Sequence, residues 1–128
     1  MTKPLAVITG ASSGIGEATA KAFSAAGYPT LLLARRLQRM EALNLPNAMC
    51  RQVDVRNRDA LVAAIREAEA EYGPTDMIFN NAGVARLADI GTQPPEDWDE
   101  MIGINTNGVM NGVYAVMGCL LYTSDAAD

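Results

Sequence analysis

The sequence contains no histidine, and it has only two cysteines, Cys50 and Cys119. Without histidine, the histidine-based catalytic triads, general bases and metal sites are all excluded. The two cysteines do not have the spacing of a metal or redox motif, so we expect no metal and a reduced, cytoplasmic setting.

The chain also has little positive charge and no long apolar run. Its 10 basic residues are outnumbered by 15 acidic ones, a net charge of −5, which argues against a nucleic-acid partner. The apolar run after Lys3 is too short for a signal peptide, and no run approaches the roughly 18 residues of a membrane span. With 128 residues, 49% of them hydrophobic, we expect one soluble domain and no membrane partner.

Residues 9–16 read TGASSGIG and lie between two apolar stretches. Leu5–Ile8 is typical of a strand buried on both faces of a parallel sheet. A helix is predicted from about Ile15, and its apolar stripe comprises Ile15, Ala18, Ala22, Phe23 and Ala26. Glycines in such a turn allow a phosphate to approach the free N–H groups of the helix start. A glycine-rich turn without a ligand is the alternative, and the missing GK[ST] ending excludes a nucleoside triphosphate P-loop.

Strand and helix patterns alternate four times along the chain. Further strands are predicted at 30–34, 48–55 and 76–79, and helices at 37–43, from Asn57 to Tyr72, and, after a loop over 83–95, from Pro95 to about Met117. Asn57 can cap the second of these helices, and the apolar face of that helix carries Leu61, Ile65, Ala68 and Tyr72. This alternation predicts an α/β fold with a doubly wound parallel sheet. Ligands of such sheets bind beyond the carboxyl ends of the strands. Those ends are Gly10–Gly16, Arg35-Arg36, Asp54-Val55 and Asn80–Gly83. Each segment alone is typical of an ordinary polar loop, but four such segments at one end of the sheet favour a common ligand-binding crevice.

The TGASSGIG turn, the Asp54-Val55 pair and the NNAG at 80–83 resemble the short-chain dehydrogenase/reductase family from residue 4 to about 118. The resemblance implies a Rossmann-like fold that binds NAD(P). It implies cofactor contacts from Gly10, Ser12, Ser13, Gly14, Ile15 and Gly16 at the pyrophosphate, from Asp54 and Val55 at the adenine, and from Asn81, Ala82 and Gly83 at the adenine ribose. Asn80 and Asn81 are implied to tie the sheet together.

Asn105 matches an asparagine in the middle of the family's fourth helix. From the residues alone it marks a kink, because asparagine is a poor helix former. The resemblance instead implies a catalytic role, in which the residue accompanies a local distortion of the helix and holds a water that leads to a catalytic lysine.

The family's catalytic Tyr-x-x-x-Lys pair is not in this sequence, because the only lysines, Lys3 and Lys21, precede every tyrosine. The last ten residues, CLLYTSDAAD, can be back-translated into a DNA sequence that looks like a widely used transposase sequencing adapter, and a hydrophobic helix end with an acidic tail is the alternative. We therefore expect residues 1–118 to be an incomplete NAD(P)-binding domain, truncated after the fourth strand–helix unit, and 119–128 to be a non-native tail. Such a fragment binds the cofactor at most. A non-catalytic nucleotide-binding module or sensor, or another Rossmann enzyme such as a methyltransferase, is the alternative.

The end of the second strand indicates which cofactor is preferred. NAD-preferring enzymes usually carry an acid there, whereas this sequence has Arg35 followed by Arg36. A guanidinium can pair with the 2′-phosphate of NADP, and we expect no nearby acid to oppose it. The resemblance further implies a small-molecule carbonyl or alcohol substrate for the full-length protein. It also implies a homo-oligomer formed through the fourth helix, which carries Trp98, Ile102, Val109, Val113 and Val116.

Overall fold

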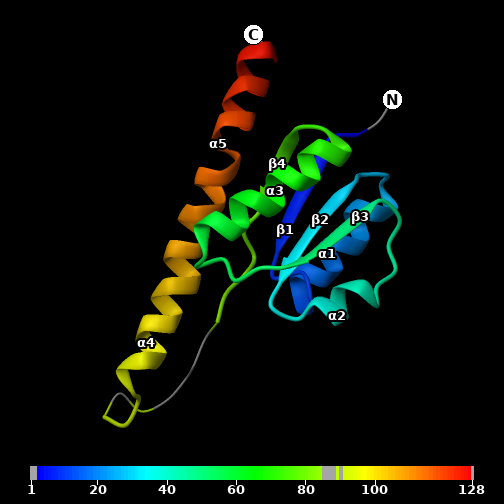
Figure 1. The fold of residues 1–128 in the computed structure, drawn as a ribbon. Helices are drawn as coiled ribbons and strands as arrows, with labels where there is room; N and C mark the ends of the chain where they lie inside the picture. Colours follow the sequence, from blue (N-terminus) through cyan, green and yellow to red (C-terminus); the bar gives the residue numbers. More distant parts are fainter. Residues whose placement is uncertain (1–2, 85–88, 90, 128) are drawn as a thin grey trace.

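The computed structural model describes residues 3–84, 89 and 91–127. Strands and helices alternate along the chain as predicted (Figure 1). Their bounds are β1 (Leu5–Thr9), α1 (Gly14–Ala25), β2 (Thr30–Ala34), α2 (Leu37–Glu41), β3 (Ala48–Gln52), α3 (Arg58–Tyr72), β4 (Thr75–Phe79), α4 (Pro95–Ile102), the π-helical segment η1 (Gly103–Asn107) and α5 (Gly108–Ala127).

The four strands form one parallel sheet in the order β3-β2-β1-β4. Val7 of β1 lies opposite Leu31 of β2 and Ile78 of β4. The carboxyl ends of all four strands therefore lie at the same end of the sheet. In this strand order, β4 is an edge strand. β3 ends at Gln52, three residues before the predicted end at Val55, because the chain turns away from the sheet in the segment that carries Asp54.

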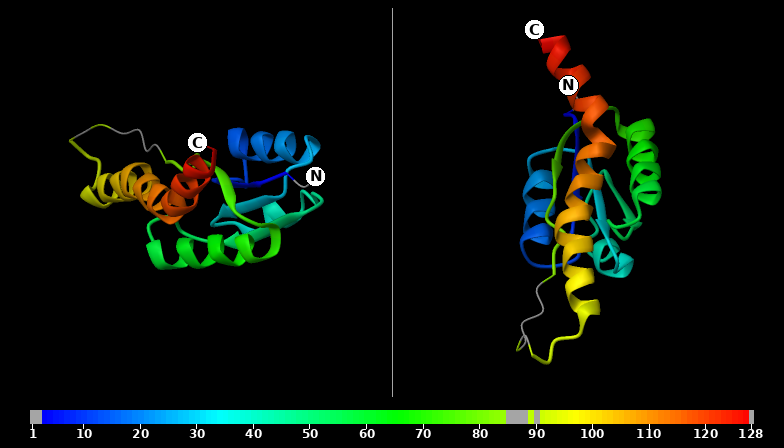
Figure 2. Two further views of the ribbon diagram at one scale, coloured as in Figure 1. Left: turned by 90° about the horizontal axis from the view of Figure 1, so that it is seen from above. Right: turned by 90° about the vertical axis from the view of Figure 1, so that its left-hand side faces the viewer.

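Helices cover both faces of the sheet, which confirms the predicted doubly wound α/β fold (Figure 2). Alternate side chains of a strand point to opposite faces. Leu31 and Leu33 of β2 pack with side chains of α3 and α5, whereas Leu32 and Ala34 pack with Ala20 of α1 and Met40 of α2. The sheet thus separates two apolar layers.

The predicted apolar stripe of α1 is wrong. Ile15 is 70% exposed, Ala18, Ala22 and Ala26 are exposed, and Phe23 is half-buried. The buried residues of this helix are Gly16 and Ala20. Small residues allow the helix backbone to approach the sheet closely, so the contact face is the one with the least side-chain volume.

The prediction for α3 is confirmed. Asn57 caps the helix, since its side chain accepts a hydrogen bond of 3.1 Å from the backbone N–H of Ala60. Leu61, Ile65 and Ala68 are buried on the sheet side. The helix ends before Gly73, whose φ of +92° suits glycine.

The predicted helix from Pro95 to Met117 is instead α4, η1 and the first half of α5, which form one long rod beside β4 and α3 (Figure 1). Val116 is buried, but Trp98, Ile102 and Val113 of the predicted apolar face are exposed and Val109 is half-buried. Residues 85–88 and 90 of the predicted loop 83–95 lie outside the described residues, as does residue 128 of the predicted tail. α5 continues through Ala127. In the part of the chain that the structure describes, no helix is both long and apolar enough to cross a membrane.

Candidate functional site

A cleft of about 640 Å³ lies at the carboxyl ends of the strands. It brings together most of the predicted site residues, namely Gly10, Ser12, Ser13, Arg35, Arg36, Asp54, Val55, Asn81, Ala82 and Gly83. Gly14, Ile15, Gly16 and Asn105 are not among the residues that line it. Four chain segments that are distant in the sequence therefore form one site, as the positions of the strand ends predict.

The glycine-rich turn forms one wall of the cleft. Gly10 has a φ of +64°, and a Cβ atom on it would lie 3.0 Å from the backbone N of Ala82. At Gly16 a Cβ atom would lie 2.1 Å from the carbonyl oxygen of Gly10, so this glycine packs behind the turn and does not line the cleft. The Ser13 side chain makes no capping hydrogen bond to α1. The first-turn N–H groups can therefore serve an anion.

Thr9, which the sequence analysis did not single out, connects the ends of β1 and β4. Its hydroxyl oxygen accepts hydrogen bonds from the backbone N–H groups of Asn81 (2.9 Å) and Ala82 (3.0 Å). The Asn81 side chain donates to the Gly10 carbonyl at 3.3 Å. Asn81 thus ties the sheet together as expected. For Asn80, the side-chain oxygen lies against α5, where a Cβ atom on Gly112 would be only 2.3 Å from it.

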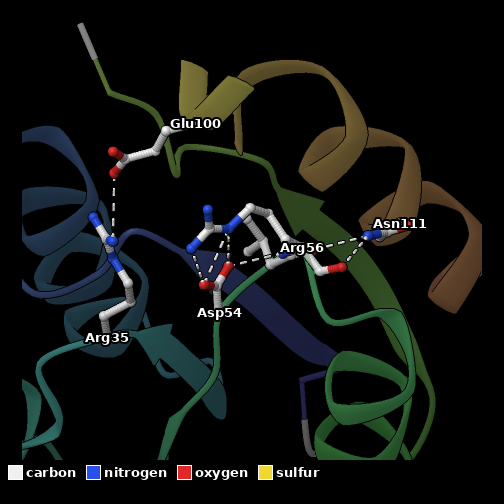
Figure 3. Close-up of polar contacts among 6 residues, drawn as sticks. Arg35, Asp54, Arg56, Glu100 and Asn111 are labelled. Atoms are coloured by element: carbon white, nitrogen blue, oxygen red, sulfur yellow. Dashed lines mark hydrogen bonds and ion pairs between the residues drawn. The ribbon is translucent and has the colours of Figure 1, made fainter. Parts of the chain in front are cut away.

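Asp54 and Arg56 form an ion pair at the centre of the cleft rim (Figure 3). Arg56 donates to the Asp54 carboxylate from Nε at 3.0 Å and from Nη2 at 2.5 Å, and its backbone N–H donates at 3.0 Å. These hydrogen bonds lower the pKa of Asp54, although its partial burial acts in the opposite direction. Asp54 therefore stays ionised, and a ligand amino group would share its carboxylate with Arg56.

Buried Asn111 holds this segment in place from α5 (Figure 3). Its side-chain amide donates to the Val55 carbonyl at 2.8 Å, and its side-chain oxygen accepts from Nε of Arg58 at 3.0 Å. No local pattern in the sequence points to this residue, because its partners lie on a segment more than 50 positions earlier.

Arg35 and Arg36 are exposed at the end of β2. The expectation that no acid lies near Arg35 is wrong. Nη1 of Arg35 is 3.6 Å from Oε1 of Glu100, a residue of α4 (Figure 3). The two residues are distant in the sequence, and only the fold brings them together.

Asn105 lies in η1 and contacts the loop that follows β4. Its side-chain oxygen accepts from the Val84 N–H at 2.8 Å, and its amide donates to the Val84 carbonyl at 2.7 Å. The helix is distorted at this residue, as the family resemblance implied. The cleft is also lined by apolar residues that were not among the predicted site residues, namely Leu33, Ala34, Val53, Val84 and Ile104.

Residues 4–127 match the family model of the short chain dehydrogenase. The chain belongs to the short-chain dehydrogenase family. Its fold is therefore that of a Rossmann-like oxidoreductase family whose members use nicotinamide cofactors.

The chain spans about half the length of the similar proteins and solved structures that it matches. An uncharacterized oxidoreductase of Listeria monocytogenes is 37% identical over 117 residues, which cover 87% of this chain and 47% of the relative. An NADP-dependent 3-hydroxy acid dehydrogenase of Salmonella typhi is 33% identical over 121 residues, 88% of this chain and 47% of the relative. An alcohol dehydrogenase from Thermococcus sibiricus, in complex with 5-hydroxy-NADP, superposes with a TM-score of 0.84 at 30% identity, covering 91% of this chain and 53% of that structure.

Proposed function

We propose that this chain is the cofactor-binding part of an NADP-preferring short-chain dehydrogenase/reductase. The observation that carries the proposal is the position of Arg35 and Arg36, which line the cleft at the end of β2 where NAD-preferring enzymes place an acid. A guanidinium forms charge-assisted, bidentate contacts with phosphate. Two similar proteins support the same cofactor, since their names include NADP dependence and a bound NADP derivative. NAD remains the second cofactor to test.

Each part of the cleft has a proposed contact with the dinucleotide. The pyrophosphate would lie on the turn of Gly10, Ser12 and Ser13 and at the start of α1, where Gly14, Ile15 and Gly16 shape the backbone. The adenine would lie beside Asp54 and Val55, and its ribose beside Asn81, Ala82 and Gly83. Bound NADPH supplies a hydride, and the chain's own residues bind and orient the molecule.

The intact protein would transfer that hydride to or from a small-molecule carbonyl or alcohol in the cytoplasm. In it, Asn105 would take part in proton transfer through a lysine that this sequence does not contain. Residues 1–118 would then be an incomplete NAD(P)-binding domain and 119–128 a non-native tail. The exposed apolar side chains of the helical rod, including Trp98, Met110 and Tyr114, are the surface through which we propose that the full-length protein forms a homo-oligomer.

Substitution of Arg35 by aspartate tests the cofactor proposal. We expect Arg35→Asp to weaken NADP binding at least about tenfold, because a charge-assisted phosphate contact becomes a repulsion, and to change NAD binding less than about threefold. Titration calorimetry with both nucleotides measures the two affinities.

Arg39→Asp is the matched control, since it makes the same charge change at an exposed residue of α2 that does not line the cleft. It should leave both affinities unchanged. Equal affinity of the unsubstituted chain for NADP and NAD would contradict the NADP preference. No binding of either nucleotide would contradict the proposed function altogether.

A further inference from the structure

The contact between Arg35 and Glu100 joins α4 to the end of β2 across the rim of the cleft (Figure 3). The Arg35 side chain is 53% exposed and the Glu100 side chain only 20%. The carboxylate is therefore the more enclosed of the two groups, while the exposed guanidinium can also reach a ligand in the cleft. Their separation of 3.6 Å is longer than a good charge-assisted hydrogen bond.

Four charged side chains meet in this part of the cleft, and their formal charges cancel. Arg35 and Arg56 contribute two positive charges, and Glu100 and Asp54 contribute two negative ones. The two pairs influence one another, because the charge of Arg35 lowers the pKa of Asp54 and the charge of Glu100 raises the pKa of Arg56. These four side chains therefore offer a phosphate group no net positive charge, and Arg36, which also lines the cleft, adds one positive charge to the site.

We propose that Glu100 is a specificity-determining residue, whose carboxylate competes with the 2′-phosphate of NADP for the guanidinium of Arg35. This inference rests on the proposed function, since it requires that the cleft bind an adenine dinucleotide. NAD has no 2′-phosphate and leaves the Arg35–Glu100 pair in place. The 2′-phosphate of NADP, in contrast, must replace the Glu100 carboxylate as the partner of Arg35. The phosphate then lies next to that negatively charged carboxylate. Glu100 thus weakens NADP binding selectively and moderates the preference that Arg35 creates.

The isosteric substitution Glu100→Gln tests this role with two small probes, 2′,5′-ADP and 5′-AMP, which differ only in the 2′-phosphate. We expect the variant to bind 2′,5′-ADP about three- to tenfold more tightly, and to change 5′-AMP affinity less than about twofold. Titration calorimetry on the 128-residue chain gives both affinities. Asp99→Asn is the control, because it removes the same charge from the neighbouring position of α4, which points about 100° away around the helix.

The dependence on Arg35 separates competition from a general change in charge. In an Arg35→Ala background, Glu100→Gln should no longer affect 2′,5′-ADP binding, whereas a purely long-range effect of charge would persist. Glu100→Ala is measured in parallel, so that a folding defect of one variant does not decide the result.

The inference is overturned if both probes bind but Glu100→Gln strengthens them equally, or if its effect persists without Arg35. If the unsubstituted chain binds neither probe, the proposed function itself has failed. The two failures are therefore distinguishable in one set of titrations.

Discussion

At the scale of single residues, Gly16 shows how the absence of a side chain shapes the cleft. A Cβ atom at this position would lie 2.1 Å from the Gly10 carbonyl oxygen and 2.6 Å from Nδ2 of Asn81. Helix propensity favours alanine over glycine by about 1 kcal/mol. The clash involves backbone, which cannot move without disturbing the turn, and it outweighs that gain.

We therefore expect Gly16→Ala to lower the free energy of unfolding by about 1–3 kcal/mol, the usual cost of overpacking. Urea denaturation measures the loss, and amide hydrogen exchange at Asn81 and Ala82 locates it. Gly14→Ala is the comparison: there the φ of +57° makes alanine strained, but no atom lies within 4 Å of the added Cβ. Faster exchange at Asn81 and Ala82 in the Gly14 variant as well would show that backbone strain, and not the clash, is responsible.

The Asp54–Arg56 ion pair makes stability depend on pH. Because the pKa of Asp54 is lower in the folded chain than its ordinary value, the ionised form favours folding. The contribution is fully present above the unfolded pKa of about 3.9, and it is lost as the pH falls through the folded value. Both side chains are partly exposed, so its size is below about 1 kcal/mol.

The unsubstituted chain should thus be more stable than its Asp54→Asn variant at pH 7, and the difference should begin to shrink as the pH falls below about 4. Thermal unfolding of the two proteins across this range checks the expectation. A stability difference that grows on acidification would contradict the assigned direction of the pKa shift.

At the scale of secondary-structure elements, Asn105 joins the π-helical segment to the loop after β4. Asn105→Ala removes two hydrogen bonds to Val84, each with a net value of about 0.5–1.5 kcal/mol. We expect amide exchange at Val84 to accelerate about tenfold, which corresponds to about 1.4 kcal/mol. Thr106→Ala, at the adjacent exposed position, should leave this exchange unchanged. Unaltered protection of Val84 in the Asn105 variant would mean that the loop is held by other contacts.

The elements themselves were largely predictable, because apolar runs, caps and glycine stops are local signals. The Asn57 cap and the buried face of α3 followed from such signals. The buried face of α1 could not be predicted in this way. Hydrophobicity favours Ile15 as a buried residue, but the small residues Gly16 and Ala20 allow the helix to pack more closely on the sheet. The apolar pattern was not used to locate η1, and the family resemblance supplied the expectation of a distorted helix at Asn105.

The site was predictable only in outline. Topology alone places the four strand ends together, so the lining residues on Gly10–Ser13, Arg35-Arg36 and Asn81–Gly83 could be anticipated. The Arg35–Glu100 contact, the Thr9 hydrogen bonds and the Asn111 anchor join residues far apart in the sequence. Such pairs depend on side-chain packing, which no local pattern encodes.

At the scale of the whole molecule, the expected activity follows from which groups the 128 residues contain. The only lysines, Lys3 and Lys21, precede every tyrosine, so the family's Tyr-x-x-x-Lys pair cannot form within this chain. General acid–base catalysis typically supplies about 10²–10⁴-fold of a rate. We expect the purified chain to bind nucleotide but to show no dehydrogenase turnover on a panel of carbonyl substrates.

Absorbance of NADPH at saturating concentration measures turnover, and calorimetry on the same preparation verifies binding. A preparation from cells that carry the empty vector is the control for contaminating enzymes. NADPH oxidation above that control would show that this chain has a proton donor that the family pattern does not identify.

The π-helical segment η1 also sets the rotational phase of everything that follows it. A π turn accommodates one more residue than an α turn, and one residue corresponds to about 100° of rotation about an α-helix axis. Asn111, Ala115 and Val116 point into the protein, while Trp98 and Ile102 of α4 are exposed. Residues before and after η1 therefore follow two different angular registers on one rod. Removal of one residue from η1 would turn the inward face of α5 by about a quarter of a circle and take Asn111 away from the Val55 carbonyl.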